Sequence, residues 1–343
     1  MRNVILSIAI GRNGDGHLAL HYAAQLHKLG LINLALVIVV GQPLLDRAVM
    51  AKKVLSQYNL DLEIPVNLGS SVTNNVLWDE TFDQDTESVE FDNAYTSLLR
   101  MFNPFGPGKR YTYIAAAGLN ELQNFLSHYA NQVVAHLEQV VVFSGVKLCS
   151  PESSGMLDAS TNNMVLAQDE LGFLAQLQNE GLLEEHKVPV TIVTKNLARA
   201  VAFDKATIES ILSESSLELL TIIQETLQLY YSTLRLNPND EYRMKYLPAH
   251  LNVADFWQQF TIKGKTKLMS PRAHVWDQID RINFYDIYCL MVLILPELFD
   301  ATTLNVIDPF SQHLSTVKVV GLEDQDHMLE NIKSNVLDVL KNI

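Results

Sequence analysis

The sequence contains only two cysteines, Cys149 and Cys289, among its 343 residues. Two cysteines are too few for a framework of disulfides. Both lie in apolar runs, where a buried free thiol is the ordinary interpretation. No Cys–His pattern lies near either residue, so a cysteine nucleophile is not indicated.

Basic residues are scarce as well. The chain has 25 lysines and arginines against 39 acidic residues, which gives a formal net charge of -14. Phosphate backbones and anionic lipid surfaces repel such a chain, so we expect it to bind neither nucleic acid nor membrane. A pocket for a neutral ligand or a cation remains compatible with this charge.

Long apolar runs are missing too. The longest, LINLALVIVVG and IYCLMVLILP, fall well short of the roughly 20 residues that cross a bilayer. The apolar start, MRNVILSIAIG, lacks a convincing small-residue cleavage site and is more typical of a buried strand than of a signal peptide. We therefore expect a soluble, cytoplasmic protein.

Apolar residues are what the chain has in abundance. Hydrophobic residues make up 48% and charged residues 19%, which provides a large core and excludes global disorder. The length suits one large α/β domain or two small ones. Because we find no internal repeat and no low-complexity linker, we predict a single domain over residues 1–343.

Strand and helix patterns alternate through the first two hundred residues. The expected strands are VILSIAI, LALVIVV, IPVNLG, YTYIAAAG, QVVVFSGV and VPVTIVTK. Continuous apolar runs of this kind indicate strands covered on both faces, and their alternation with helices indicates parallel βαβ units. The polar, acidic residues 70–92 are interpreted as a surface loop, and a helix is expected over 164–179.

The chain becomes helical from about residue 205, beginning with ATIESILSESSLELLTIIQETLQLYYSTLRL and including a later helix over 284–295. We therefore predict an α/β fold with a doubly wound, mostly parallel sheet. Helices should cover both faces, and the carboxyl-terminal third should be helical.

Ligands bind at the carboxyl ends of the strands in an open parallel sheet, so the loop after the first strand is the first candidate for a site. It reads VILSIAIGRNGDGHLAL. This segment resembles the inosine–uridine nucleoside hydrolases, in which a strand ends in Asp-x-Asp-x-Gly, further aspartates follow, and a helix begins with Ala-Leu-Ala-Leu. Gly11 and residues 18–20 match that motif.

The same resemblance shows what has changed. The two leading aspartates of the family fall on Ser7 and Ala9, and the later acidic positions fall on Asn13, Asp15 and Gly16. The family uses its aspartates to hold calcium, a cation that takes about 6–8 oxygen ligands and activates a bound water. Among these five positions only one carboxylate and one amide oxygen remain.

Two further segments resemble the family in the same order. VIVVGQPLLDRAVMAKKVL is similar to its second strand, turn and helix, with Gln42 where the family has asparagine. YTYIAAAGLNELQNFL is similar to the strand that carries the family's main-chain calcium ligand, which would be the carbonyl of Ala117.

The remaining matches come later in the chain. VVVFSGVK resembles the strand before the Glu-x-Asn that binds the ribose hydroxyls, and those two positions are Met156 and Asp158. FYDIYCLMVLILPELF resembles the late helix, with Asp286 at the family's last calcium ligand and Tyr285 in place of the proposed leaving-group histidine. In all, the resemblance covers roughly residues 1–205 and 280–300.

Two interpretations of the remaining acids stay open. Asp15, Asn13, the carbonyl of Ala117 and Asp286 would be the ligands of a weak calcium site. Alternatively, Asp15 and Asp286 cap the helices that follow them, which we favour because so few metal ligands remain.

Two histidines stand four residues apart on the first helix. His17 and His21 have the spacing of zinc ligands, but no third ligand is evident, so we interpret them as ordinary helix residues. His17 lies near the mouth of the expected pocket and is a candidate ligand contact.

These patterns lead to two functional hypotheses. We favour a nucleoside hydrolase-like protein, catalytically impaired or inactive, that keeps a pocket at the strand ends for a ligand or partner. The alternative is an active N-ribosyl hydrolase of purine or pyrimidine nucleosides with a rearranged metal site. We expect a nucleoside-like or sugar ligand, no cofactor beyond weak calcium, and a homo-oligomer. The candidate pocket residues are Ser7, Ala9, Asn13, Asp15, His17, Gln42, Met156, Asp158 and Tyr285.

Overall fold

The structure, a computed structural model of the chain, describes residues 1–11, 14–70, 91–103, 108–117, 119–144, 146–148, 154–157, 188–247, 252–262, 274–307, 314–320 and 326–343. Five sequence-based expectations lie wholly or largely outside these residues. They concern Asn13, Cys149, Asp158, the polar loop at 70–92 and the helix at 164–179.

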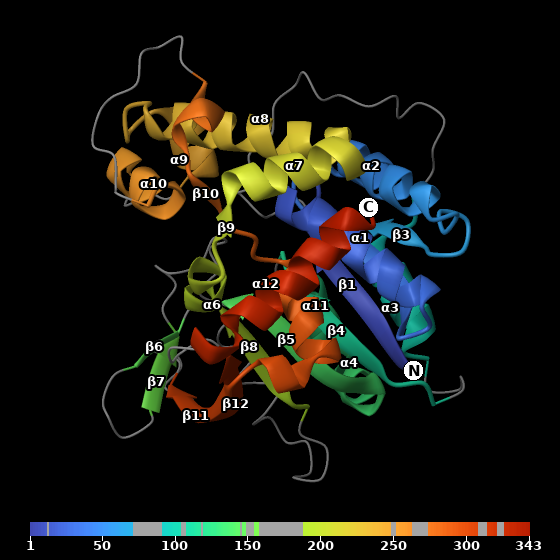
Figure 1. Ribbon diagram of the computed structural model, residues 1–343. Helices are drawn as coiled ribbons and strands as arrows, with labels where there is room; N and C mark the ends of the chain where they lie inside the picture. The colour runs from blue at the N-terminus through green and yellow to red at the C-terminus, as the bar shows by residue number, and fades with distance from the viewer. Residues whose placement is uncertain are drawn as a thin grey trace.

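A ten-stranded sheet forms the centre of the described chain, in the order β3-β2-β1-β4-β5-β8-β12-β11-β7-β6 (Figure 1). Its first seven strands run parallel: β3 (Val66–Leu68), β2 (Ile32–Val39), β1 (Arg2–Ile8), β4 (Tyr111–Ala115), β5 (Leu137–Ser144), β8 (Val190–Thr194) and β12 (Leu314–Val320). Next come β11 (Ala301–Ile307), antiparallel to β12, then β7 (Ser154–Leu157), parallel to β11, and β6 (Val146–Leu148), antiparallel to β7. The predicted mostly parallel sheet is confirmed.

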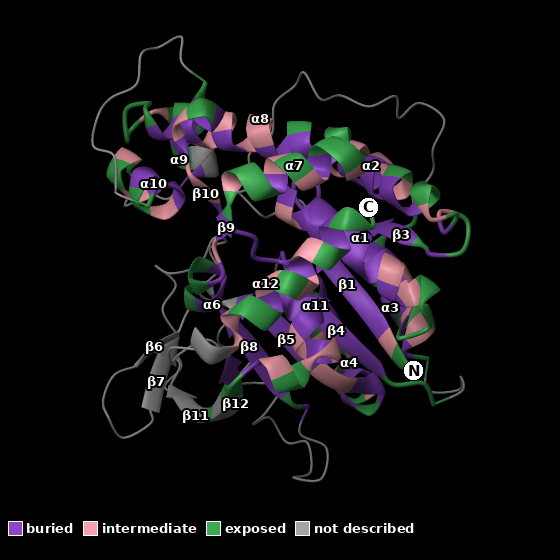
Figure 2. Cartoon of the chain, viewed as in Figure 1, coloured by how far each residue is buried: buried purple, intermediate pink, exposed green. Residues whose placement is uncertain are grey.

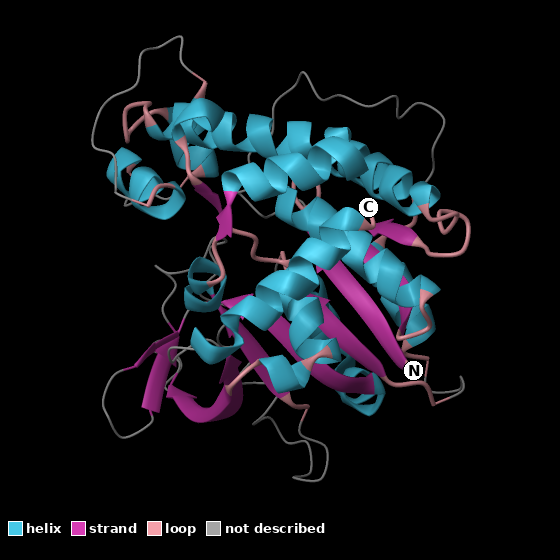
Figure 3. Ribbon diagram, viewed as in Figure 1, coloured by secondary structure: helices cyan, strands magenta, loops and turns pink. Residues whose placement is uncertain are grey.

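Helices cover both faces of this sheet, as expected (Figure 3). One face carries α1 (Gly14–Lys28), α2 (Leu44–Gln57), α7 (Lys205–Ser215), α8 (Leu217–Leu234), α11 (Ile287–Ile294) and α12 (Asp326–Lys341). The other carries α3 (Ala94–Met101) and α4 (Asn120–His136). Successive side chains of a strand point to opposite faces. Val4 and Leu6 of β1 therefore pack under the first group of helices, whereas Ile5 of β1 and Ala9 just after it pack under α3 and α4. Strands β4 and β8 are therefore buried along their whole length, and β1 is buried from Val4 onward (Figure 2).

The carboxyl-terminal part differs from the expectation in two ways. Besides α6 (Lys195–Ala200), α9 (Glu241–Tyr246), α10 (Val253–Phe260) and the short 3-10 turns η4 (Val275–Gln278) and η5 (Pro296–Leu298), it contributes strands β11 and β12 to the main sheet. It also forms a two-stranded ribbon of β9 (Phe203–Asp204) with β10 (Arg281–Ile282). The long helical pattern after residue 205 breaks at Ser216, whose side chain caps α8 by accepting from the amide of Leu219. None of the helices in the described ranges is long and apolar enough to cross a membrane.

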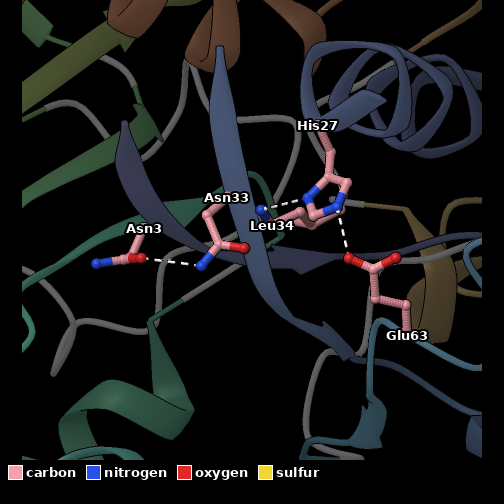
Figure 4. Close-up of polar contacts among 5 residues, drawn as sticks. All are labelled: Asn3, His27, Asn33, Leu34 and Glu63. Atoms are coloured by element: carbon pink, nitrogen blue, oxygen red, sulfur yellow. Dashed lines mark hydrogen bonds and ion pairs between the residues drawn. The ribbon is translucent and has the colours of Figure 1, made fainter. Parts of the chain in front are cut away.

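The amino edge of the sheet is fastened by polar side chains (Figure 4). Nδ1 of His27 accepts a hydrogen bond from the backbone N–H of Leu34, with 3.1 Å between the two nitrogens. Nε2 of the same ring lies 3.0 Å from Oε1 of Glu63. Because an amide can only donate, the proton of the neutral ring must be on Nε2, which donates to the carboxylate. Asn33 Nδ2 donates to Asn3 Oδ1 over 2.9 Å, between β2 and β1. These contacts hold the strand starts in register.

Arg47 fastens the opposite, carboxyl edge. Its side chain is fully buried, and Nε and Nη2 donate to the carbonyl of Gln42 over 3.1 and 3.0 Å. Nη1 donates to the carbonyl of Ile10. Gly41, beside this turn, has a φ of 85°, a conformation that favours glycine. One guanidinium thus joins the loops after β1 and β2, from which the candidate site is built.

Replacing Arg47 with methionine should lower the free energy of unfolding by about 2–4 kcal/mol, because the carbonyls of Ile10 and Gln42 lose buried donors. Urea denaturation measures this. Arg100→Met is the matched control, since Arg100 forms an exposed ion pair with Asp92 and its loss should cost less than about 1 kcal/mol. Equal effects of the two substitutions would contradict the proposed role of Arg47.

Candidate functional site

The candidate site begins where β1, β2 and β4 end side by side, which we call the carboxyl edge. Ser7 pairs with Ile38 of β2 and Ala115 of β4, and its carbonyl accepts the amide of Ala116 over 3.0 Å. Gln42 follows β2, and Ala117 follows β4. The structure therefore places Ser7, Ala9, Gln42 and Ala117 at the ends of adjacent parallel strands.

Ser7 is fully buried, and its Oγ has no hydrogen-bond partner among the described residues. It shares one side of the β1 segment with Ile5 and Ala9, the side that α3 and α4 cover. A buried hydroxyl without a partner costs about 1–3 kcal/mol, so its presence calls for an explanation.

Two carboxyl groups meet beside this edge although 270 residues separate Asp15 from Tyr285, the neighbour of Asp286. Oδ1 of Asp15, in the first turn of α1, accepts the amide of Tyr285 over 3.3 Å. Burial raises the pKa of Asp15 to about 7, while this hydrogen bond acts in the opposite direction. Burial, and then the charge of Asp15, raise the pKa of Asp286 well above its ordinary value. The pair therefore retains at least one proton at neutral pH.

The expectation that Asp286 caps the late helix is wrong. It stands at the N-cap position of α11, but its backbone is helical and its side chain makes no capping hydrogen bond. Asp15 does not occupy the N-cap position of α1, which begins at Gly14. It lies within the first turn of α1, where an acidic side chain interacts favourably with the helix dipole. Its contact with the amide of Tyr285 joins α1 to the chain segment before α11.

Tyr285 occupies the position where the resemblance places a histidine. Its hydroxyl accepts from Nε2 of Gln259 on α10, and its ring packs edge-on against Phe143 of β5, 5.7 Å between centroids. Burial, and after it the charge of Asp15, raise its pKa above the ordinary tyrosine value. The hydroxyl of Tyr285 is thus buried and hydrogen-bonded, and its raised pKa makes it a poor proton donor at neutral pH.

His17 and His21 are both buried and both neutral. Nε2 of His17 donates to the carbonyl of Gly11 over 2.8 Å, and burial lowers its pKa to about 4. Nδ1 of His21 lies 3.1 Å from the hydroxyl of Tyr58, and burial lowers its pKa to about 3. Within the part of the chain that is described, no group of three or more His, Cys, Asp or Glu residues is arranged to hold a metal. The histidine pair gains no third zinc ligand there.

The surroundings of Gly16 leave no space for a carboxylate at this position. A Cβ at this position would lie 2.6 Å from the carbonyl oxygen of Ala9 and 3.2 Å from Cα of Ile10, both backbone atoms. The first turn of α1 thus lies against the end of β1 with no room for a side chain. Position 16 therefore has no side-chain oxygen to offer a calcium ion, which takes about 6–8 oxygen ligands.

Two buried residues at this edge were not among the sequence candidates. Tyr288, one helical turn after Tyr285, is fully buried, and in the part of the chain that is described its hydroxyl has no hydrogen-bond partner. Burial, and after it the charge of Asp15, raise its pKa. Glu121, in the first turn of α4, accepts from the amide of Ser70 at Oε1, while Oε2 has no partner within the described ranges. The sequence signal that could have identified Glu121 was an acidic residue at the start of the helix that follows the fourth strand.

Met156 is the candidate that the structure does not bring to this edge. It lies in β7, and five strands separate β7 from β1 in the sheet order. Its backbone is therefore well apart from Ser7. The edge brings together Ser7, Ala9, Asp15, Gln42, Ala117, Tyr285 and Asp286.

Comparison with known proteins bears on the fold. No family model matches the chain, and no curated protein matches it. Solved structures do. The effector protein XOO4466 aligns with 17% identity and a TM-score of 0.67 over 99% of this chain and 93% of its own. This chain therefore shares the fold of that effector.

Two further structures support this assignment. The type III effector protein XopQ, solved with adenosine diphosphate ribose, aligns with 15% identity and a TM-score of 0.69 over 99% of this chain and 92% of its own. The inosine–uridine preferring nucleoside hydrolase from Bacillus anthracis aligns with 12% identity and a TM-score of 0.57 over the full length of both chains. These structural alignments establish that the fold is nucleoside hydrolase-like. Because the sequence identities are so low, activity has to be argued from the site.

Asp15 should make stability depend on pH. Its pKa is about 7 in the folded chain and near 3.8 when unfolded, so between these pH values the folded state binds more protons than the unfolded state. Relative to Asp15→Asn, the wild type should lose about 1–4 kcal/mol as pH rises from 4 to 7. Urea denaturation of both proteins across this range measures the difference. Asp338→Asn controls for the loss of one exposed carboxylate, and a difference that stays flat would refute the burial argument.

Substituting Gly16 with alanine should destabilise the chain by about 1–3 kcal/mol, because the added Cβ meets the backbone of Ala9. The matched control is Gly108→Ala, whose Cβ would meet no atom within 4 Å. Thermal denaturation compares the two variants. A Gly16→Ala protein as stable as the control would show that α1 can move away from β1.

Proposed function

We propose that this protein is a nucleoside hydrolase-like binding protein that does not hydrolyse nucleosides and that holds a nucleoside-like or sugar-containing molecule at the carboxyl edge. The observation that carries the proposal is the contact between Gly16 and the backbone of Ala9, which leaves no space for a carboxylate at a position where the related motif has one. Low identity to the solved structures supports a common fold with altered chemistry.

Charge at the edge supports the same conclusion. Calcium-dependent hydrolysis, as the resemblance implies, needs several carboxylates around one cation. Here Ser7 and Ala9 are buried and uncharged, and the Asp15–Asp286 pair keeps a proton. A cation would have to displace that proton before binding, which weakens its apparent affinity at neutral pH.

Unsatisfied polar groups support a bound polar ligand. The hydroxyls of Ser7 and Tyr288 and Oε2 of Glu121 are buried without partners among the described atoms. Buried polar groups in native proteins nearly always find a partner, so groups left open near one edge favour a ligand rich in hydroxyls. The complex of XopQ with adenosine diphosphate ribose shows that a protein of this fold binds such a molecule.

One observation favours the alternative of an active hydrolase. A carboxyl with a pKa of about 7 is suited to act as a general base near neutral pH, and Asp15 is such a group. In that case Asp15 would take the proton of the attacking water. The second requirement, an acid for the leaving base, is not met by Tyr285, whose pKa is raised and whose hydroxyl already accepts from Gln259. We therefore keep the binding function as the main proposal.

Purified protein should leave inosine, uridine and adenosine intact, both with millimolar calcium and with a chelator. The reason is the loss of general-base and metal assistance, the first of which alone is worth about 10²–10⁴-fold. A reducing-sugar assay measures ribose release. The melting temperature should be the same with calcium and with chelator, since an ion that does not bind cannot stabilise the fold.

Two outcomes would contradict this proposal. The first is ribose release that Asp15→Ala or Asp286→Ala abolishes, which would make these residues catalytic. The second is calorimetric binding of calcium at micromolar concentration. Calorimetry with the same nucleosides and with adenosine diphosphate ribose tests the binding function directly, and Ser7→Val should weaken any binding at the carboxyl edge by removing its hydroxyl. The homo-oligomer and the cytoplasmic location remain predictions.

A further inference from the structure

A second concave site lies away from the carboxyl edge, among α1, α2 and the start of α8. The cavity measures about 120 Å³ and is lined by residues of these three helices, which we call the helix pocket. His17 and His21 of α1 line it, and they lie about 200–240° around the helix from Asp15 at 100° per residue. Asp15 contacts the segment before α11, so the helix pocket is distinct from the site described above.

Two imidazoles line the pocket on the α1 side, and each already uses one ring nitrogen. His17 Nε2 donates to the carbonyl of Gly11, so its Nδ1 is an acceptor. Gln25 Nε2 donates to the hydroxyl of Tyr58 over 3.4 Å, and we assign the proton of that hydroxyl to Nδ1 of His21, 3.1 Å away. The proton of the His21 ring is then on Nε2, which is a donor. The pair thus offers one acceptor and one donor.

The walls and the mouth of the pocket differ in character. Four apolar side chains form the walls: Met50, Val54, Leu219 and Ile222. Such walls suit the faces of a flat ring, and a methionine thioether makes favourable contacts with aromatic rings. Lys53 and Glu218, both exposed, stand at the mouth with opposite charges, so the mouth selects neither an anion nor a cation.

We propose that the helix pocket binds a small uncharged heteroaromatic molecule that carries an amide, either within its ring or as a carboxamide. An amide presents a donor and an acceptor side by side, which complements the donor and acceptor of His21 and His17. The cavity is smaller than the roughly 300–1,000 Å³ of drug-sized pockets, so the ligand is limited to a single ring or a compact fused pair. A charged ligand would find no carboxylate, ammonium or guanidinium group among the buried side chains that line the pocket.

Three probes test this proposal on the full chain: nicotinamide, 2-pyridone and pyrazine carboxamide. Saturation-transfer NMR and calorimetry should detect at least one of them, with a Kd between about 10 µM and 10 mM for ligands of this size. Nicotinic acid, which has the ring of nicotinamide and a carboxylate in place of the amide, should bind at least tenfold more weakly. Val54→Phe, which fills the cavity, should abolish binding.

Matched variants separate this pocket from other sites. Lys53→Ala and Glu218→Ala should change the Kd less than twofold, because the ligand is uncharged. Asp286→Asn, at the carboxyl edge, should also leave it unchanged, so the result is independent of the proposed function. His21→Gln should weaken binding at least fivefold, and provides a second test should Val54→Phe fail to fold.

Histidine labelled with ¹³C in the ring gives a direct readout. The signals of His17 and His21, assigned from single substitutions, should shift on titration while that of His128 on the surface of α4 should not. The proposal is overturned if none of the three probes binds, or if binding survives both Val54→Phe and His21→Gln. It is equally overturned if nicotinic acid binds as well as nicotinamide and Lys53→Ala abolishes that binding.

Discussion

The start of helix α1 packs directly on the end of strand β1, and much of the candidate site depends on this contact. Gly16 approaches the carbonyl of Ala9 so closely that a single added carbon would collide with backbone. The contact positions Asp15 to receive the amide of Tyr285 and places His17 where it binds the carbonyl of Gly11. Because helix and strand are this close, position 16 has no room for a side chain.

Polar groups of the chain itself hold this edge together. Arg47 provides a buried positive charge that holds the loops after β1 and β2 together through their carbonyls. The remaining acids, Asp15 and Asp286, lower their mutual repulsion by keeping a proton. Cohesion at this edge therefore comes from hydrogen bonds and protonation within the chain.

The sequence predicted the parallel sheet well because a strand buried on both faces is a continuous apolar run, as in β1 and β4. It missed β11 and β12, whose alternating polar residues in ATTLNVI and LSTVKVV follow a long helical region and have no such run. The resemblance placed Asp15 and Asp286 at one edge, although no local pattern could show that they touch. Neither could it reveal the space around Gly16, the unsatisfied hydroxyl of Tyr288, or the helix pocket, since each depends on packing between distant segments.

The amino edge of the sheet has a consequence for how this fold can vary. His27, Glu63, Asn3 and Asn33 hold β1 and β2 in register with contacts that involve no residue of the carboxyl edge. A sheet anchored at one end keeps its strand alignment while the loops at its other end change composition. The effectors and the hydrolase share this architecture with the present chain at only 12–17% identity, so the alignment of the strands tolerates extensive change in composition elsewhere.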